Sequence, residues 1–316
     1  MSEKIVKTKI PTVEELLLAG AHFGHQTRRW NPKMAPFVYK VQQGVHIIDL
    51  YKTHDHLQKA ADFLKDVAAK GGQVIFVGTK GQAREIVQNR ATESGALFVV
   101  ERWLGGTLTN FHEIKKRLDY LKDYYKKSEA NAFTAFTKKE RLLMSREAEK
   151  MHKVLGGILT LNGRPGAVVV IDPHREHIVV RECLRLNIPI VALADTNCDP
   201  TGINYIIPAN DDAIKAIELV VTTLAEAVKG GYGIAGISVE ASKLIVETQH
   251  AASKAEPKPT SVETSDISTL KLSNRSVNAL NKAGITTVEE LKKTDLATIK
   301  GLGAKSVDEI KKAIKS

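Results

Sequence analysis

Cysteine is scarce in this protein, with Cys183 and Cys198 the only two among 316 residues. Two thiols cannot build the disulfide framework of a small secreted domain, and they are typical of reduced cytosolic thiols. Long apolar runs are also lacking: none approaches the about 20 residues that span a bilayer. The N-terminus, MSEKIVKTKI, has no apolar core of a signal peptide. These absences predict a soluble, cytoplasmic protein.

Acidic residues are missing from residues 20–40, GAHFGHQTRRWNPKMAPFVYK, which combine basic with aromatic side chains. Pro32 and Pro36 prevent a continuous helix beyond Trp30. Arginine and lysine neutralise phosphates and flat rings stack on bases, so this composition favours contact with RNA. The alternative is a basic surface loop whose aromatic side chains pack into the core. The candidate RNA-binding residues here are His22, His25, Arg28, Arg29, Trp30, Asn31 and Lys33.

The net charge of +10 indicates a polyanionic partner. Behind the basic stretch, short runs rich in β-branched residues alternate with helical patterns. Buried strands that alternate with helices predict a parallel sheet covered on both faces, a three-layer α/β domain. The expected strands of this sheet are 73–77, 97–100, 167–171, 189–193 and 205–207, and residues 45–50 form a brief strand-like run before them. The expected helices are 11–19, 55–69, 82–94, 178–186 and 212–228.

Residues 104–161 interrupt this alternation with two long helical patterns and no strand. Apolar side chains recur at steps of three and four from Phe111 to Tyr125 and again from Met144 to Ile158, which predicts an antiparallel helical hairpin projecting from the sheet. Its outer faces are rich in lysine and arginine, which favours an arm lying against RNA over a solvated coiled coil. The further candidate RNA-binding residues are Lys80, Arg102, Lys115, Lys116, Lys138 and Lys139.

The tail is separated from the rest by a polar, proline-containing stretch, residues 249–268, which predicts a flexible linker after a domain of residues 1–248. Residues 269–316 then have the glycine turn between helices of a small all-α, helix-hairpin-helix domain, whose backbone N–H groups can face a phosphate. This tail resembles the C-terminal domain of the bacterial RNA polymerase α subunit. The resemblance implies a nucleic-acid-binding face with Arg275, Asn278, Gly303, Lys305 and Ser306.

Two glycine motifs suggest phosphate binding but lack the flanking strand or loop that a phosphate site needs. Gly231 to Gly236 fit G-x-G-x-x-G, yet follow a helical pattern where the dinucleotide fingerprint needs a strand. Lys80, after Gly78 and Thr79, follows a strand but lacks a phosphate-cradling loop. No cofactor is therefore predicted.

Metal and catalytic sites are weighed in the same way. His22 and His25 have a spacing that metals tolerate, but no further histidine or cysteine pair completes a tetrahedral set. No nucleophile in a recognisable elbow accompanies the strongest enzyme-like group, so no metal or catalytic residue is predicted. That group is Asp172, His174, Glu176 and His177, and it is interpreted, like Asp195 with Asp199 and Asp211 with Asp212, as turns and helix caps.

Five motifs together carry a family resemblance over about residues 5 to 250. In order they are AGAHFGHQTRRWNPKM, VHIIDL, FVGTK, RWLGGTLTNF and the run from IDPHREH to DTNCDP. They resemble ribosomal protein two of the bacterial small subunit. The resemblance implies a five-stranded parallel sheet and a non-enzymatic, structural component of the small subunit that binds its ribosomal RNA between head and body. It also implies neighbouring ribosomal proteins as partners, including docking of ribosomal protein one.

Two alternatives remain open at this point. One is an α/β nucleotide-binding enzyme that shares only the sheet. The other concerns the tail, which could be a protein-docking or transcription-linked regulatory module rather than a binder of DNA or RNA.

Overall fold

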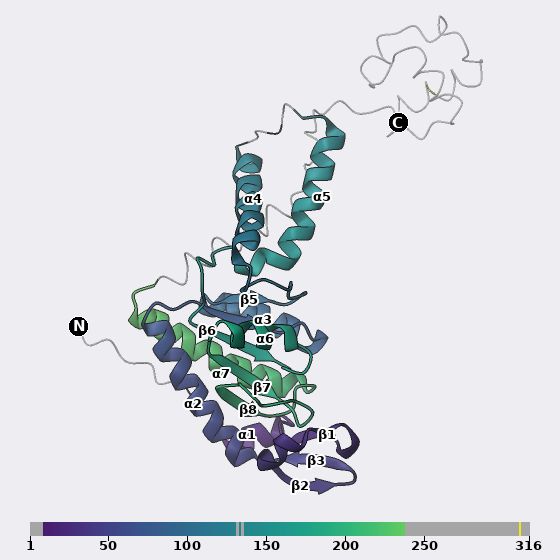
Figure 1. Ribbon diagram of the computed structural model, residues 1–316, viewed down its shortest axis with the longest axis vertical. Helices are drawn as coiled ribbons and strands as arrows, with labels where there is room; N and C mark the ends of the chain where they lie inside the picture. Colours follow the sequence, from purple (N-terminus) through teal and green to yellow (C-terminus); the bar gives the residue numbers. More distant parts are fainter. Residues whose placement is uncertain (1–8, 131–132, 134–135, 238–309, 311–316) are drawn as a thin grey trace, which may run out of the picture. The chain divides into compact units, whose positions relative to one another are not determined.

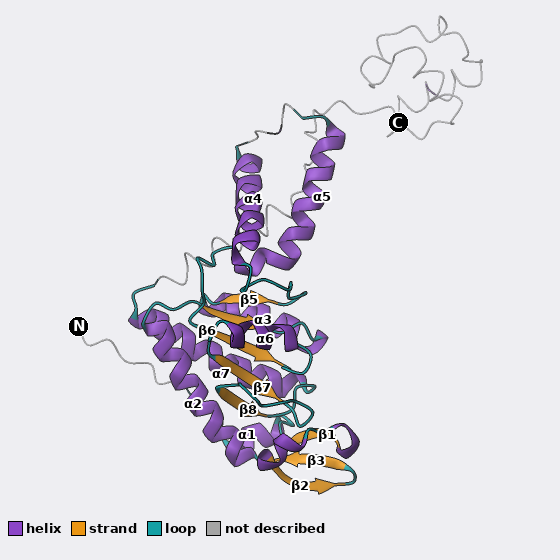
Figure 2. Ribbon diagram, in the orientation of Figure 1, coloured by secondary structure: helices purple, strands orange, loops and turns teal. Residues whose placement is uncertain are grey.

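A computed structural model describes residues 9–130, 133, 136–237 and 310 of the protein. Its centre is a five-stranded sheet in the order β5-β4-β6-β7-β8 (Figures 1 and 2), in which every pair of neighbouring strands is parallel. The predicted α/β fold with five parallel strands is confirmed. The strands are β4 (Val74–Val77), β5 (Leu97–Val99), β6 (Ala167–Ile171), β7 (Ile190–Ala194) and β8 (Tyr205–Pro208).

Helices cover both faces of this sheet because successive side chains of a strand point to opposite sides. Val74 and Phe76 of β4 join a core with α2, α3 and α7, whereas Ile75 and Val77 join a second core with α4, α5 and α6. Strands buried on both faces explain the continuous apolar runs in the sequence. The helices are α2 (Leu50–Ala69), α3 (Gly81–Ser94), α4 (Phe111–Glu129), α5 (Lys138–Leu155), α6 (His177–Arg185) and α7 (Ile214–Ile234).

Two helices are longer than the sequence predicts. Helix α2 begins at Leu50 rather than at residue 55, because Asp49 caps it by accepting from the N–H groups of Tyr51 and Lys52. Helix α7 continues past residue 228, where the predicted helix ends, and runs through three glycines to Ile234. None of the described helices has the length and apolar character of a membrane span.

The predicted helical hairpin is present as α4 and α5, which lie side by side beyond the β5 edge of the sheet (Figure 1). Its seam contains the buried side chains Leu118 and Leu121 of α4 and Ala148 of α5. Between the same two helices, the Tyr125 hydroxyl and Nδ1 of His152 lie 2.7 Å apart, in hydrogen-bond contact. The 3₁₀ turn η4 (Gly156–Ile158) then leads back towards the sheet.

The N-terminal part contains a second sheet that the sequence analysis does not predict. Its strands, in the order β1-β3-β2, pair antiparallel, and the two-residue turn Gln43-Gly44, with both φ angles positive, joins β2 to β3. The basic stretch is therefore structured rather than a loop. The elements of the whole N-terminal part are helix α1 (Val13–Leu18), strands β1 (Phe23–Gln26), β2 (Val38–Gln42) and β3 (Val45–Ile48), and the 3₁₀ turns η1 (Thr27–Arg29) and η2 (Pro32–Phe37).

Candidate nucleic-acid interface

Arg28 and Arg29 are two neighbouring cations of the basic stretch that remain available to a partner, as does Lys40 at the end of that stretch. Both lie exposed in η1, which follows strand β1. The Arg28 guanidinium donates from Nε to Oε1 of Gln26 at 2.9 Å, and neither arginine forms an ion pair with any carboxylate of the described residues. A short turn of two free guanidinium groups is suited to a phosphate backbone, because each offers several donors in a planar fork.

Lys33 and Asn31 have partners within the protein. The Lys33 ammonium lies 2.9 Å from Oδ2 of Asp199 and 2.8 Å from the Thr201 hydroxyl. Hydrogen bonds from Thr201 and Lys33 lower the pKa of Asp199 to about 2. Asn31 caps η2, with its side-chain oxygen accepting from the Lys33 N–H at 3.0 Å. Lys33 remains exposed, but an RNA phosphate would have to compete with Asp199 for it.

The aromatic side chains divide between internal stacking and exposure. Trp30 is half-buried and stacks on His46, with ring centroids 4.6 Å apart. The ring of His22 lies against Phe23, and burial lowers the pKa of His22. Phe23 and Tyr39 are 51% and 71% exposed. Trp30 thus stacks on a neighbouring ring while part of it stays accessible, and the more exposed rings are Phe23 and Tyr39.

His25 turns inward to the end of the parallel sheet. Its Nδ1 lies 2.9 Å from Oδ2 of Asp195, and its backbone N–H donates to Asp195 and to the Thr196 hydroxyl. The hydrogen bond to Asp195 raises the pKa of His25, against an opposing effect of burial. Gly24 leaves this approach open, since a Cβ there would lie 2.7 Å from Cγ2 of Thr196. His25 therefore ties strand β1, and with it the two arginines, to strand β7.

Lys80 lies among carboxylates rather than on the surface. Its ammonium is 2.8 Å from Oδ1 of Asp211, 2.7 Å from Oδ1 of Asp212 and 3.8 Å from Oδ2 of Asp172, and its side chain is 12% exposed. Burial, reinforced by Asp172 and Asp195, raises the pKa of Asp211 to about 7. Lys80 therefore neutralises carboxylates at the carboxyl ends of the strands, and little of its ammonium is left to bind a phosphate.

The cap expected from Asp211 and Asp212 is wrong. Helix α7 has no side-chain cap on its N-cap residue, Ala213. Asn210 instead accepts from the N–H groups of Asp212 and Ala213, which leaves both aspartates facing Lys80. An asparagine just before two aspartates was the signal in the sequence for this arrangement.

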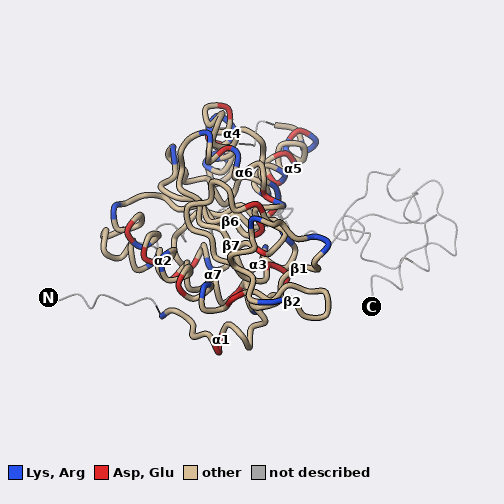
Figure 3. Tube along the Cα trace, turned by 60° about the horizontal axis from the view of Figure 1, so that its bottom comes forward, with Lys and Arg blue, Asp and Glu red and all other residues tan. Residues whose placement is uncertain are grey.

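The hairpin carries four of the candidate cations, Lys115, Lys116, Lys138 and Lys139. Figure 3 shows lysine and arginine recurring along α4 and α5 and beside β1 and β2. Lys115, Lys138 and Lys139 are exposed, whereas Lys116 pairs with Glu113 at 2.7 Å. Glu113 and other acidic residues share these helices, so the hairpin surface is mixed in charge, and the free lysines are its candidate contacts.

The enzyme-like group does not assemble into one site. His174 and His177 are exposed, while Asp172 and Glu176 are buried. Glu176 accepts from the Thr79 hydroxyl, which in turn accepts from Nε of Arg175. These side chains lie between the carboxyl ends of β4 and β6, where the strand order reverses and α/β sheets bind their ligands. They fill that position with their own hydrogen bonds.

Glu182 of α6 fixes the loop that presents Arg102. Its carboxylate accepts from the indole N–H of Trp103 at 3.1 Å and from the backbone N–H groups of Gly106, Leu108 and Thr109 at 2.7, 2.9 and 3.0 Å. Burial raises the pKa of Glu182, but these hydrogen bonds outweigh it and hold the pKa below its ordinary value. Glu182 carries no signal in the sequence, because its hydrogen-bond partners are 73 to 79 positions away.

Replacing Glu182 with glutamine is expected to destabilise the protein by about 2–3 kcal/mol, because the amide leaves buried donors unpaired. A depressed pKa contributes stability above the unfolded value and loses it as the pH falls through the folded value. The difference in unfolding free energy between the two proteins should thus be constant near neutral pH and shrink below the ordinary value of 4.5. Urea unfolding across this range measures it; a constant difference would contradict the assignment.

The sheet and the hairpin define an α/β protein with exposed cations suited to a polyanionic partner. A family model for ribosomal protein S2 matches residues 16–231, and the chain belongs to this family. The small ribosomal subunit protein uS2 of Maridesulfovibrio salexigens is 48% identical over 244 residues, which cover 77% of this chain and 93% of the relative. The uS2 proteins of Solidesulfovibrio magneticus (52% identity; 70% and 85% covered) and Sorangium cellulosum (49%; 68% and 77%) are also similar.

Membership confirms the resemblance on which the sequence analysis relied. The protein is a structural component of the small ribosomal subunit and works in translation within a ribonucleoprotein. The relatives are named as ribosomal proteins rather than as enzymes. Residues 253–316 match a second model, that of the C-terminal domain of the bacterial RNA polymerase alpha subunit, as the sequence analysis expects. The candidate residues of the tail lie outside the described residues.

Proposed function

We propose that this protein binds small-subunit ribosomal RNA through the exposed cations of η1 and of the helical hairpin. The observation that carries the proposal is that some candidate cations are paired with carboxylates and others are not. Lys33, Lys80 and Lys116 have carboxylate partners, whereas Arg28 and Arg29 have none within the described residues. Exposed guanidinium groups without a carboxylate partner keep their charge available to an external polyanion.

The mechanism is positioning rather than catalysis. Strand β1 is held to the sheet by His25 and Asp195, so Arg28 and Arg29 are presented from a rigid element. Arg102 is presented likewise by the loop that Glu182 fixes. Contacts to phosphates set the position of RNA segments without reading their sequence. We extend the proposal to a location between head and body of the subunit, in which the domain and the hairpin contact separate RNA segments.

Titration of the full-length protein with small-subunit ribosomal RNA at graded salt tests this proposal. The logarithm of the affinity should fall linearly with the logarithm of the salt concentration, with a slope of about −0.7 to −0.9 per phosphate contact. An affinity that does not change with salt would contradict electrostatic binding. Nucleotide turnover by the RNA-free protein would instead favour the enzyme alternative.

Docking of ribosomal protein one is proposed at an apolar groove between α1 and the small sheet. The groove has a volume of about 600 Å³, and Leu17, Phe23, Tyr39 and Tyr51 line it. All four side chains are at least half exposed. Exposed apolar side chains around a hollow are typical of a protein contact rather than of a phosphate contact. The groove thus supports a protein partner on the same end of the molecule as the basic turn.

For the tail, we propose a nucleic-acid-binding module connected by the linker of residues 249–268. The match to the polymerase domain supports this function, with Arg275, Asn278, Gly303, Lys305 and Ser306 as its contact residues. A protein-docking or transcription-linked role is the competing proposal. Comparing the full-length protein with a version that ends at residue 248 for binding of duplex DNA and of structured RNA distinguishes them.

A further inference from the structure

The solvent-exposed side of helix α6 carries charge of one sign. From residue 172 to residue 187, every acidic side chain is buried and every arginine is exposed. Val179 and Cys183 hold the opposite side of the helix in the core. His177, Arg181 and Arg185 follow one another at steps of four, so they share one side of the helix, which we call the α6 face. No acidic side chain interrupts this face.

The carboxylates of the α6 segment are engaged inside the protein. Glu176 accepts from the Thr79 hydroxyl, and Glu182 accepts from the N–H groups of the loop that follows Trp103. A glutamate three positions before an arginine normally pairs with it on a helix surface, as Glu182 and Arg185 are spaced. Because Glu182 turns inward instead, the positive charge of Arg185 is not neutralised by its own helix.

The arginines of the α6 face have no partner elsewhere in the described part of the chain. Neither Arg181 nor Arg185 forms an ion pair or a side-chain hydrogen bond with a described residue. Arg90 of α3 shows the contrast, since its guanidinium lies 3.0 Å from Glu93 and 3.1 Å from Glu218. Both α6 guanidinium groups therefore keep their full set of donors for an external ligand.

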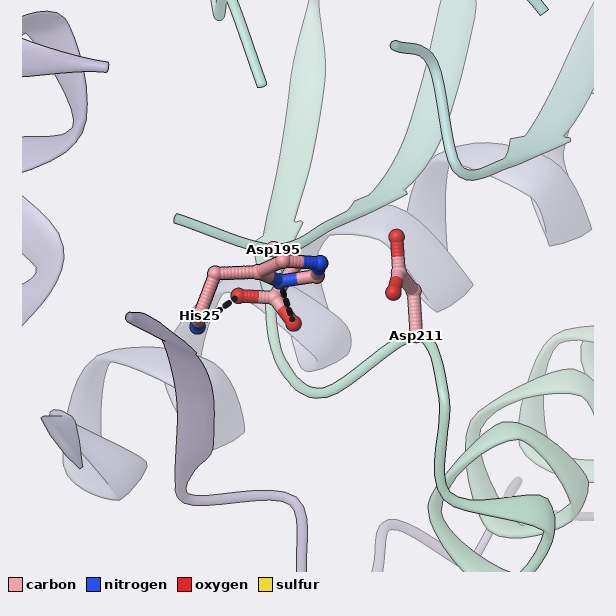
Figure 4. Close-up of side chains that lie close together, drawn as sticks. All are labelled: His25, Asp195 and Asp211. Atoms are coloured by element: carbon pink, nitrogen blue, oxygen red, sulfur yellow. Dashed lines mark hydrogen bonds and ion pairs between the residues drawn. The ribbon is translucent and has the colours of Figure 1, made fainter. Parts of the chain in front are cut away.

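The acidic residues that follow β7 and β8 have partners of their own. Asp195 and Asp211 each place a carboxylate oxygen within 4.8 Å of a ring nitrogen of His25, beside which Figure 4 shows them. Asp211 and Asp212 also face Lys80, at 2.8 and 2.7 Å. These carboxylates thus neutralise cations at the strand ends and leave the α6 face basic.

Two further arginines border the α6 face. Arg164 donates from Nη2 to the backbone oxygen of Asn187 at 2.5 Å, which places its guanidinium at the C-terminal end of the helix. Arg102 is exposed on the loop that Glu182 fixes to α6. The same carboxylate therefore holds the helix and the loop together, and the cations of both are presented from one rigid unit.

We propose that the α6 face binds the phosphate backbone of RNA, as a contact surface separate from η1 and from the helical hairpin. The inference rests on the proposed RNA binding and adds His177, Arg181 and Arg185 to the contact residues. Residues four apart rise about 6 Å along a helix, so the three side chains can follow the phosphates of one strand. Guanidinium forks pair with phosphate oxygens through two hydrogen bonds, and an imidazole N–H donates one.

A protein partner fits this face less well than a polyanion does. The exposed apolar side chains of α6 are Ile178 and Leu184, at 42% and 43%. Leu184 already lies over Gly202, where a Cβ would come within 2.7 Å of its side chain. The core of a protein interface is depleted of charge and rich in aromatic residues, whereas a surface charged with one sign attracts a polyanion.

The test is the affinity of the full-length double variant Arg181→Gln, Arg185→Gln for small-subunit ribosomal RNA, measured by filter binding at graded salt. Glutamine has nearly the helix propensity of arginine, so α6 should remain folded with an unchanged circular dichroism spectrum. The affinity should fall about tenfold at moderate salt, and the salt dependence should flatten by about 1.5 units of slope. An affinity and slope equal to those of the wild type would overturn the proposal.

Arg90→Gln is the matched control for Arg181→Gln, because each removes one guanidinium from a helix that covers the sheet. Arg90 is already neutralised by carboxylates, so its replacement should change RNA binding much less. Equal losses in the two single variants would overturn the proposal. The double variant Arg28→Ala, Arg29→Ala separates this inference from the proposed function: a loss there, with none in the α6 variant, leaves η1 as an RNA contact and removes the α6 face.

Chemical modification of arginine gives a second measurement that needs no variant. Bound RNA should slow the reaction of phenylglyoxal with Arg181 and Arg185, followed by mass spectrometry of peptides from the full-length protein. High salt, which releases RNA, should restore the reaction rate. Equal rates with and without bound RNA at low salt would show that the α6 face makes no contact with RNA.

Discussion

Replacing Arg28 and Arg29 together with alanine is expected to lower the affinity of the protein for small-subunit ribosomal RNA by about tenfold at moderate salt. Each arginine is expected to contact one phosphate, because neither guanidinium is neutralised within the described residues. The salt dependence should flatten by about 1.5 units of slope, since two counterion-releasing contacts are lost. Filter binding of the full-length protein at four or more salt concentrations measures both quantities.

The control removes the same charge elsewhere. Lys59 of α2 and Lys215 of α7 are exposed lysines on the helices that cover the sheet. Their double replacement with alanine should change the affinity and the slope much less. Equal losses in both double variants would mean that net charge, rather than the η1 turn, determines binding. An unchanged affinity of the arginine variant would mean that the turn makes no RNA contact.

Gly231→Ala is expected to destabilise the protein by about 3 kcal/mol, the largest effect on stability that we predict for one methyl group. Gly231 is buried in α7 where this helix crosses α2. A Cβ at this position would lie 2.4 Å from the backbone oxygen of Lys65 and 2.6 Å from Cβ of Ala68. No rotamer relieves a clash with backbone, so the two helices would have to separate.

Gly230 provides the control in the preceding position of the same helix. A Cβ there meets nothing within 4 Å among the described residues, so Gly230→Ala should stabilise α7 by about 0.5–1 kcal/mol. Urea unfolding of the two variants and the wild type measures the difference. Similar effects of the two substitutions would contradict a packing role for Gly231. The result also bears on the G-x-G-x-x-G pattern, since a packing role for its first glycine explains that glycine without a cofactor.

The sheet and the hairpin were predictable because their signals are local. Apolar runs such as 167–171 mark strands buried on both faces, and the steps of three and four after Phe111 mark a helix seam. Boundaries were less predictable. The start of α2 depends on a cap by Asp49, and the end of α7 on close packing of Gly231 against another helix.

The candidate site was predictable only in part, since composition marks a basic stretch but not the partners of each cation. Arg28 and Arg29 are exposed, as an RNA contact requires. Lys80 looked equally basic, yet its partner Asp211 lies 131 positions away, and only the parallel order of the strands brings the two together. A similar distance in sequence hid the group of His25, Asp195 and Asp211. The identity of one residue does not indicate which distant residue it will contact in the folded protein.

A density map of the small subunit containing this protein tests the central claim most directly. The account predicts that the guanidinium groups of Arg28 and Arg29 lie within about 4 Å of RNA phosphate oxygens, with free lysines of α4 and α5 against a separate RNA segment. A map in which the η1 turn faces solvent or protein, with no phosphate near either arginine, would contradict it.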